Sequence, residues 1–254
     1  MSAGRPRGTG SVGTTVLGLG AAVGVAVTVA LGLALPDTRE QGEYARLIAV
    51  HPPLAWVAYV AVGVTALGSA LWLWPRTRSL TWDRLAGASA EIAVLFTALT
   101  LVTGSIWGRA TWGVWWAWDA RLTLTAVLLV IELGYLALRR VPAPRTVQAT
   151  RAAIAALLAA VVVPINHMAV EWWRTLHQGR SLIQTDPGEA ADPPFVAAML
   201  VGFAAMTLVY AWMLWHRARI ARLEEELDEA GLSAALAERH AEGRAQLETE
   251  VAAR

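Results

Sequence analysis

The sequence contains no cysteine and no lysine. The absence of cysteine excludes disulfides, thiolate metal sites and cysteine nucleophiles, so any bound metal must be held by histidine or carboxylate side chains. All 21 basic residues are arginine, a bias from which no functional conclusion follows. The chain also has no internal repeat and no glycine-rich phosphate-binding loop, so nothing in it indicates direct use of ATP.

Charged residues are scarce as well. They make up 16% of the 254 residues, whereas 56% are hydrophobic, which is typical of a bilayer protein. Each apolar stretch is close to the ~20 residues that a helix needs to cross ~30 Å of hydrocarbon. The six stretches are 13–35, 48–74, 85–107, 120–138, 151–170 and 194–215. The sequence therefore predicts an all-α integral membrane protein with six transmembrane helices in residues 1–215.

The first stretch resembles a signal peptide, because Arg5 and Arg7 precede it. It lacks an evident cleavage site and is long enough to remain as an anchor, so we expect it to be retained.

Arginines in the short connections predict the orientation, because cytoplasmic loops carry an excess of positive charge. Twelve lie in the N-terminal segment, the second and fourth connections and the start of the tail: Arg5, Arg7, Arg76, Arg78, Arg84, Arg139, Arg140, Arg145, Arg151, Arg217, Arg219 and Arg222. Six lie in the other connections: Arg39, Arg46, Arg109, Arg121, Arg174 and Arg180. Both termini are therefore expected in the cytoplasm. His51, the tryptophan-rich connection and the segment 166–179 then lie together on the outer side.

Residues 216–254 form a charged cytoplasmic tail that is rich in alanine, glutamate and arginine. Leucines at helical spacing indicate a surface helix or a partly disordered segment, and a helix that docks a cytosolic partner is the alternative. Gly231 and Gly243 are expected to interrupt it.

Five tryptophans lie within the twelve residues from Trp107 to Trp118. Indole rings are large and mostly apolar with a single N–H donor, so such a cluster forms a platform for a planar ligand or for the membrane surface. An interfacial belt spreads its tryptophans around helix ends, and it accounts for Trp56, Trp72, Trp74, Trp82, Trp212 and Trp215. The dense run, joined by Trp172 and Trp173 in the last outer loop, favours a ligand platform.

Three histidines are candidate metal ligands. His51 begins the second helix, where a histidine is by itself more typical of a hydrogen-bonded interfacial residue than of a ligand. His177 follows Trp173 by four residues, so a helix there would place both side chains on one face. His167 is a rival of His177 or a supporting residue. Two imidazoles from different outer segments, with an aromatic surface between them, match the requirements of six-coordinate haem iron.

Haem propionates favour arginine side chains and helix N-termini, and Arg109, Arg121 and Arg174 lie at suitable places. Arg121 has alternatives, since it can pair with Asp119 or with a lipid phosphate. Asp119 is explained at least as well as the N-cap of the fourth helix as by a direct ligand contact.

Two glutamates lie inside apolar stretches and are functional candidates on that ground. Glu91 and Glu132 are both within two turns of the cytoplasmic helix ends, near Arg84 and Arg139. Snorkelling or ion pairing therefore explains them better than a site does. No continuous polar path through the membrane is predicted.

Two motifs carry a resemblance to a known family. WGVWWAWDARLT (112–123), preceded by LVTGSIWG (101–108), is similar to the signature of the tryptophan-rich (WWD) haem-handling membrane proteins. VEWWRTLHQG (170–179) resembles the last outer loop of one member family, cytochrome c maturation protein C, also called haem exporter protein C. The resemblance covers roughly residues 40–215.

The resemblance implies a role in the bacterial cytoplasmic membrane that is not enzymatic. Such a protein binds haem b at the outer face and presents it to a membrane-anchored haem chaperone (CcmE-like). Its other implied partners are ATP-binding-cassette ATPase and permease subunits (CcmA-like and CcmB-like) and a small single-span subunit (CcmD-like). No nucleic acid is implied.

The residues that match the family motifs take their roles from the resemblance. His51 and His177 match the axial haem ligands. The haem-contact and chaperone-docking surface is matched by Trp112, Trp115, Trp116, Trp118 and Asp119. Arg121, Trp172 and Trp173 complete the candidate haem-binding set.

Two other classes of function remain as alternatives. A membrane electron-transfer enzyme of the cytochrome b kind holds haem between histidines inside the spans, and here no histidine lies near the middle of a span. The runner-up is a membrane-spanning permease subunit of an ABC transporter for haem or another solute.

Overall fold

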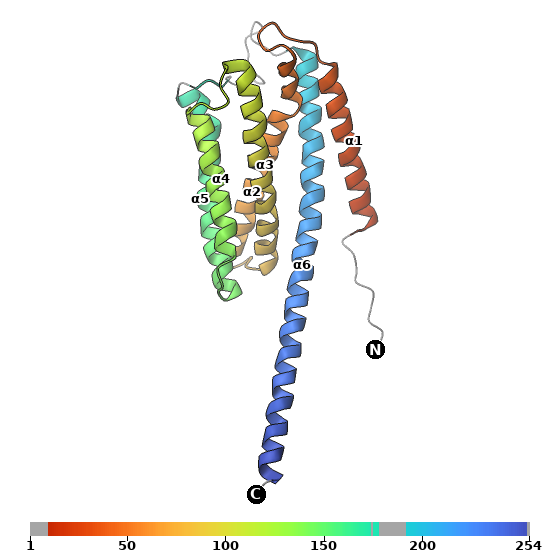
Figure 1. Cartoon of the computed structure of the whole chain (residues 1–254), viewed down its shortest axis with the longest axis vertical. Coiled ribbons are helices and arrows are strands. Elements are labelled where there is room, and N and C mark those ends of the chain that lie inside the picture. The colour runs from red at the N-terminus through yellow and green to blue at the C-terminus, as the bar shows by residue number, and fades with distance from the viewer. Residues whose placement is uncertain (1–9, 174, 178–191, 253–254) are drawn as a thin grey trace.

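The computed structural model describes residues 10–173, 175–177 and 192–252. Its long helices are α1 (Val12–Ala34), α2 (His51–Leu73), α3 (Leu80–Trp112), α4 (Ala120–Arg139), α5 (Arg145–Trp172) and α6 (Pro193–Ala252), and a short 3₁₀ helix, η1 (Glu43–Ala49), precedes α2 (Figure 1). Six helices are long and apolar enough to cross a membrane, and no strand occurs in the described residues. The predicted fold class and number of spans are confirmed.

Local signals at the helix ends explain why the helices begin and end where they do. The Ser79 side chain caps α3 by accepting from the backbone N–H of Thr81, and α3 ends at Gly113, whose φ of 78° is the left-handed conformation that favours glycine. The Asp119 side chain caps α4. Trp107 and Trp112 are therefore helical residues of α3. The connection between α3 and α4 is shorter than the bounds of the apolar stretches predicted.

The helices pack in pairs through small side chains. α2 lies against α3, α4 lies against α5, and α1 contacts α6 and η1. Gly24 of α1 faces Ala205 of α6 so closely that a Cβ added at the glycine would lie 3.0 Å from the alanine Cβ. Small residues of this kind let membrane helices approach closely, because lipid supplies little hydrophobic force to hold them together.

One end of the bundle is held by ion pairs. Arg139 of α4 makes two hydrogen bonds to the carboxylate of Asp83 on α3, at 2.6 and 2.9 Å. Arg84 pairs with Glu225 of α6 at 2.6 Å, and Arg217 pairs with Glu91. The ion pairing predicted for Glu91 is therefore confirmed, although its partner is Arg217 instead of Arg84.

The prediction for Glu132 is wrong. Its residue exposure is only 4%, so it does not snorkel, and its carboxyl accepts a hydrogen bond from the Thr97 hydroxyl at 3.0 Å. The position along α4 was correct, but the side chain points between α3 and α4 and not toward the bundle end.

α6 continues without a break as far as Ala252, so the interruptions expected at Gly231 and Gly243 do not occur. Each glycine costs about 1 kcal/mol relative to alanine in a helix. The flanking alanines, glutamates, leucines and arginines are strong helix formers, and Arg222 and Glu226 add an i,i+4 ion pair. The lower half of α6 extends well past the other helices (Figure 1).

Trp72 was expected in the interfacial belt, but it is buried. Its exposure is 3%, and its indole N–H donates to Thr150 of α5 at 3.3 Å. It is a core residue that joins α2 to α5.

Candidate ligand-binding cavity

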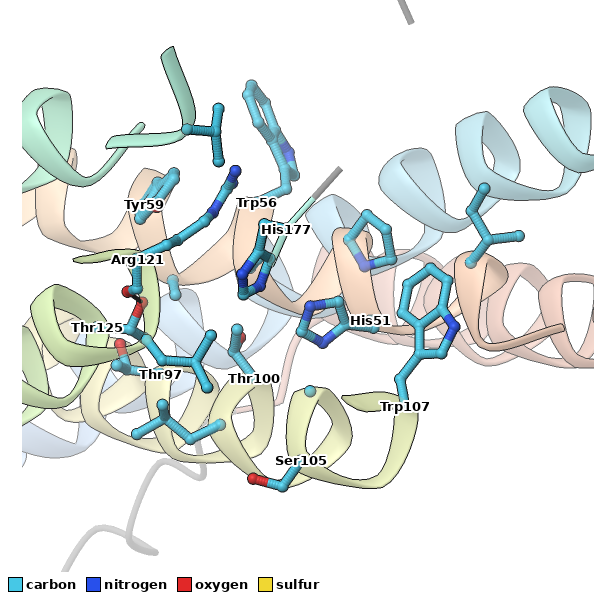
Figure 2. A pocket seen from close by; sticks show the side chains of 18 of the residues that line it. His51, Trp56, Tyr59, Thr97, Thr100, Ser105, Trp107, Arg121, Thr125 and His177 are labelled. Atoms are coloured by element: carbon cyan, nitrogen blue, oxygen red, sulfur yellow. Dashed lines mark hydrogen bonds between the residues drawn. The ribbon is translucent and has the colours of Figure 1, made fainter. Parts of the chain in front are cut away.

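A cavity of about 470 Å³ opens at the end of the bundle opposite the ion pairs. Its walls come from α2, α3, α4, α5 and α6, and Figure 2 shows 18 of the side chains that line it. The volume lies within the range of small-molecule and cofactor sites, about 300–1,000 Å³. The cavity reaches Leu128, eight residues into α4 and thus about 12 Å below its start. It is a pocket that enters the bundle and is deeper than the outer tryptophan platform that the sequence predicted.

His51 lies on one wall of the cavity, at the first residue of α2. Its Nδ1 is 3.0 Å from the hydroxyl oxygen of Thr103 on α3. That hydroxyl donates its own hydrogen to the backbone oxygen of Leu99 at 2.8 Å, so it accepts from His51. The Nδ1 of His51 therefore carries the hydrogen, and its Nε2 keeps a lone pair.

Gly104 allows the His51 ring to lie directly against α3. A Cβ added at this glycine would lie 3.0 Å from Cε1 of the His51 ring, closer than van der Waals contact allows without movement. Trp107, one turn further along α3, meets the same ring edge to face with centroids 5.6 Å apart. The indole N–H of Trp107 is in turn held by the side-chain oxygen of Gln41 at 3.0 Å. The orientation of His51 is fixed by these contacts.

His177 lies on the facing wall, and Asp119 holds its ring. One oxygen of Asp119, Oδ1, accepts from the backbone N–H of Leu122 at 2.8 Å and caps α4. The other, Oδ2, is 3.2 Å from the N–H of Leu176 and 3.3 Å from Nδ1 of His177. A carboxylate only accepts hydrogen bonds, so Nδ1 of His177 also carries its hydrogen and leaves Nε2 with a lone pair. The N-cap interpretation of Asp119 is confirmed, and the same side chain positions His177.

The His177 ring is neutral in this environment. Burial lowers the pKa of His177, the positive charge of Arg121 lowers it further, and the hydrogen bond to Asp119 opposes both. The pKa therefore lies below the ordinary value of about 6.5, and the contact with Asp119 is a hydrogen bond of a neutral imidazole near pH 7. Figure 2 shows the two imidazoles side by side, with Trp107 beyond His51 and Arg121 beyond His177. They are close enough to interact electrostatically.

The expected helical pairing of Trp173 with His177 is wrong, because α5 ends at Trp172 and His177 follows in non-helical chain. The aromatic neighbour of His177 is Trp112 of α3, whose ring meets it edge to face with centroids 5.0 Å apart. The indole beside His177 therefore comes from the last turn of α3, and not from Trp173 as the sequence predicted.

The tryptophans of the motif divide into two sets. Trp107, Trp112 and Trp116 line the cavity, and the indole Nε1 of Trp116 is a buried donor with no partner among the described residues. Four others face outward, namely Trp115 (61% exposed), Trp118 (80%), Trp172 (57%) and Trp173 (50%). Trp172 and Trp173 stack edge to face at 5.8 Å and do not line the cavity. We call these four the outer tryptophan surface.

Cationic residues were predicted beside the ligand, and one of them lines the cavity. Arg121 of α4 lies beside Tyr59 of α2 in the wall of the cavity (Figure 2). Arg109 is not in the lining; its guanidinium donates to the backbone oxygen of Gly113 and closes the end of α3. Arg174 lies outside the described residues.

His167 also lines the cavity, from α5. Pro164 lies inside α5 and the helix continues past it, so His167 is a helical residue. Three imidazoles thus face one pocket, and His167 remains a candidate ligand beside His177.

Sequence reasoning missed several residues of the site. Gln41 lies in no motif, and Thr103 lies in the motif at 101–108 but was given no role. Tyr59 and Trp56 lie in an apolar stretch where they are typical of a membrane helix. Trp56 was assigned to the interfacial belt, but it lines the cavity and donates to Thr207 of α6 at 3.1 Å. The spacing of Trp56 and Tyr59 was an available signal, since residues three apart share one face of a helix.

A comparison with known proteins assigns the family. The sequence matches the family model described as CcmC, Heme exporter protein C, over residues 9–232. The chain belongs to the Heme exporter protein C family. The match extends further in both directions than the resemblance over residues 40–215 predicted, and it includes the part of α6 just beyond the bundle.

Curated members of the Heme exporter protein C family agree with this assignment. The chain is 38% identical to Heme exporter protein C of Haemophilus influenzae over 208 residues, which are 80% of this chain and 81% of that protein. It is 37% identical to the Escherichia coli protein of the same name over 181 residues, 68% of this chain and 71% of that protein. It is also 36% identical to a putative cytochrome c biosynthesis ccmC-like mitochondrial protein of Arabidopsis thaliana, over 62% of this chain and 58% of that protein.

Proposed function

We propose that this protein binds haem b in the cavity and delivers it to a membrane-anchored haem chaperone during cytochrome c maturation. One observation carries the proposal: His51 and His177 each donate their Nδ1 hydrogen to a fixed acceptor and keep the Nε2 lone pair available. Metal-binding histidines have this arrangement, because the second hydrogen bond fixes the tautomer and orients the ring. Two such imidazoles satisfy the axial positions of iron whose other donors belong to a porphyrin.

The remaining lining fits a porphyrin. Trp112 and Trp116 supply apolar area for the macrocycle, and the unpartnered indole N–H of Trp116 is a donor for an oxygen atom of the ligand. Arg121 supplies a cation for a propionate. The chain has no cysteine to form a covalent bond with a haem vinyl group, so these residues would hold and release haem without such a bond.

The ligand assignment is tested by the absorption spectrum of the protein purified in detergent and titrated with haem. We expect a six-coordinate low-spin spectrum that His51→Ala and His177→Ala each convert to a five-coordinate one. His216→Ala is the matched control, because His216 lies on α6 against Trp212, away from the cavity lining. A loss of the spectrum in His167→Ala, with His177→Ala unchanged, would assign the second ligand to His167 instead.

The outer tryptophan surface has a separate role in this proposal, as the site where the chaperone docks. Exposed indoles of this kind are typical of binding surfaces. We expect Trp112→Phe and Trp116→Phe to weaken haem retention. Trp115→Phe with Trp118→Phe should leave the haem spectrum intact but slow transfer to the purified chaperone domain. Equal transfer rates in the wild type and the double variant would remove the docking role.

The proposal places the cavity on the outer side of the bacterial cytoplasmic membrane, with the ATP-binding-cassette subunits and the small single-span subunit as further partners. The arginine excess at the opposite end of the bundle supports this orientation. Because the chain has no cysteine, single substitutions test it directly. In intact spheroplasts, a membrane-impermeant maleimide should label Val114→Cys and not Arg239→Cys, and the reverse pattern would overturn the orientation.

A further inference from the structure

The inner face of α4 is polar along most of its length. Residues 121, 125, 128, 132, 135 and 139 are spaced three and four apart and therefore share one face of the helix. The buried residues of α4 are Leu128, Glu132 and Tyr135, whereas Val130 and Leu133 are exposed on other faces. Five of the six positions on this inner face are polar, which the averaged hydropathy of the stretch conceals.

Glu132 is a carboxyl group without a counter-charge. Oε1 accepts from the Thr97 hydroxyl at 3.0 Å, and Oε2 has no hydrogen-bond partner among the described residues. The nearest cation along this face, Arg139, already makes two hydrogen bonds to Asp83. An isolated carboxylate buried among membrane helices costs several kcal/mol, so the carboxyl group holds a proton instead.

α4 packs against two helices, α3 and α5, and these two helices supply the surroundings of Glu132. α3 supplies Thr97 and, further along, the carboxylates of Asp83 and Glu91, each paired with an arginine. α5 faces this part of α4 with alanines, and α4 itself adds Tyr135, which accepts from Arg139 at 3.3 Å. No described charge is therefore paired with Glu132.

A single hydroxyl group separates this carboxyl group from the cavity. Thr97 lines the cavity and is also the hydrogen-bond partner of Glu132. Leu128, one turn above Glu132, forms part of the same cavity wall. Among the described residues, the lining holds Arg121 and three imidazoles but no carboxylate, and both oxygens of Asp119 are already engaged with the cap and with His177. Glu132 is thus the buried acid best placed to respond to positive charge in the cavity.

We infer that Glu132 is a proton-exchanging site of the cavity. It is protonated when the cavity holds no positively charged metal centre, and it loses its proton when a metalloporphyrin with such a centre binds. In this step the O–H bond of Glu132 breaks, the proton passes to water, and the carboxylate, which still accepts from the Thr97 hydroxyl, balances the charge of the metal centre. No electron is transferred. The inference rests on the proposed function, because it takes ferric haem as the ligand.

The first test counts protons. Weakly buffered protein with a pH-indicator dye is mixed with ferric haem at a pH of about 8, where imidazoles with ordinary pKa values are neutral. We expect wild type to release about one proton per haem more than Glu132→Gln does. Zinc protoporphyrin, whose metal centre is neutral, is the ligand control and should give no such difference. Equal release by wild type and Glu132→Gln with ferric haem would overturn the inference.

The second test needs no haem. Infrared spectra of the haem-free protein should contain the carbonyl band of a protonated carboxylic acid that shifts in deuterium oxide. Glu132→Gln should remove this band, and Thr97→Val should shift it by removing the hydrogen bond. Glu91→Gln, the same substitution at an ion-paired glutamate, is the matched control and should leave it unchanged. A wild-type spectrum without the band overturns the inference even if haem binds.

The two proposals fail in different ways. If wild type gives no spectral change with haem, the proposed function is wrong, and so is the release of a proton from Glu132 on haem binding. If wild type binds haem and the proton counts are equal, only the inference about Glu132 falls. If Glu132→Gln does not fold, both tests are made with Thr97→Val. We then expect a shifted infrared band and altered proton release. Unchanged values of both would contradict the inference.

Discussion

Replacing Asp119 by asparagine would separate two tasks that a single carboxylate performs. Its Oδ1 caps α4 through Leu122, and its Oδ2 accepts from Leu176 and from the ring of His177. An asparagine side chain has one oxygen and one NH₂ group. If the oxygen keeps the cap, the NH₂ group faces two other donors. Asp119→Asn therefore retains the helix cap and loses its hold on His177.

The expected magnitudes follow from these contacts. Asparagine and aspartate are about equal as N-caps, so the free energy of unfolding should change by no more than a few tenths of a kcal/mol. Loss of the partner of a metal-binding histidine lowers affinity by about 10–100-fold, which corresponds to about 1.4–2.7 kcal/mol. Asp119→Ala removes the cap as well, and it should lower stability by a further ~1 kcal/mol.

The assay is a haem titration followed by absorbance, paired with thermal unfolding of the same haem-free samples in detergent. Unchanged haem affinity in Asp119→Asn would refute the reasoning that Asp119 orients His177. An unfolding temperature as low as that of Asp119→Ala would refute the separation of the two tasks, because it would mean that the asparagine does not keep the cap.

Three further changes have predictable results. Gly104→Ala places a Cβ 3.0 Å from the His51 ring, so haem affinity should fall at unchanged helix content, and a titration equal to wild type would contradict this. Gly202→Ala places a Cβ 2.6 Å from the backbone oxygen of Ala49, so the free energy of unfolding, measured by thermal unfolding, should fall by about 1–3 kcal/mol. An unfolding curve equal to that of wild type would contradict this. Asp83→Asn leaves its partly buried arginine partner without a counter-charge and should cost on the order of 3 kcal/mol, and an unfolding curve that matched wild type at low salt would disprove this.

The spans could be predicted from the sequence because the bilayer imposes a length and an apolar composition on each of them. Helix ends could be predicted less well, since they depend on individual caps. Ser79 starts α3 several residues before the apolar stretch, and Gly113 ends it after Trp112. The uninterrupted helix of α6 past Gly231 and Gly243 was not predicted, because these two glycines were taken as helix breakers despite the many helix-forming residues around them.

The site could be predicted in part. His51, Trp112, Trp116 and Arg121 line the cavity together with His177, as expected of ligand-binding candidates. The direction in which each tryptophan points could not be predicted, because it depends on where α3 stops and on an irregular chain with no period. The contact between His177 and Asp119 joins residues 58 positions apart, and only the folded arrangement of α4 beside the end of α5 brings them together.

The burial of Glu132 shows a different limit. Distance from the helix end predicted an ion pair, but the side chain faces α3, and this direction depends on how α3 and α4 are aligned. Hydropathy treats a helix as an average over all its faces, so it conceals a single polar face.

The length of α6 has a mechanical consequence. At 1.5 Å per residue its 60 residues form a rod of about 90 Å, three times the hydrocarbon thickness. Met199 and Phe203 near one end belong to the cavity wall, while Glu225 much further along is clamped to Arg84. The wall of the pocket and the ion pair at the far end of the bundle are therefore joined through one unbroken helix, with no loop between them.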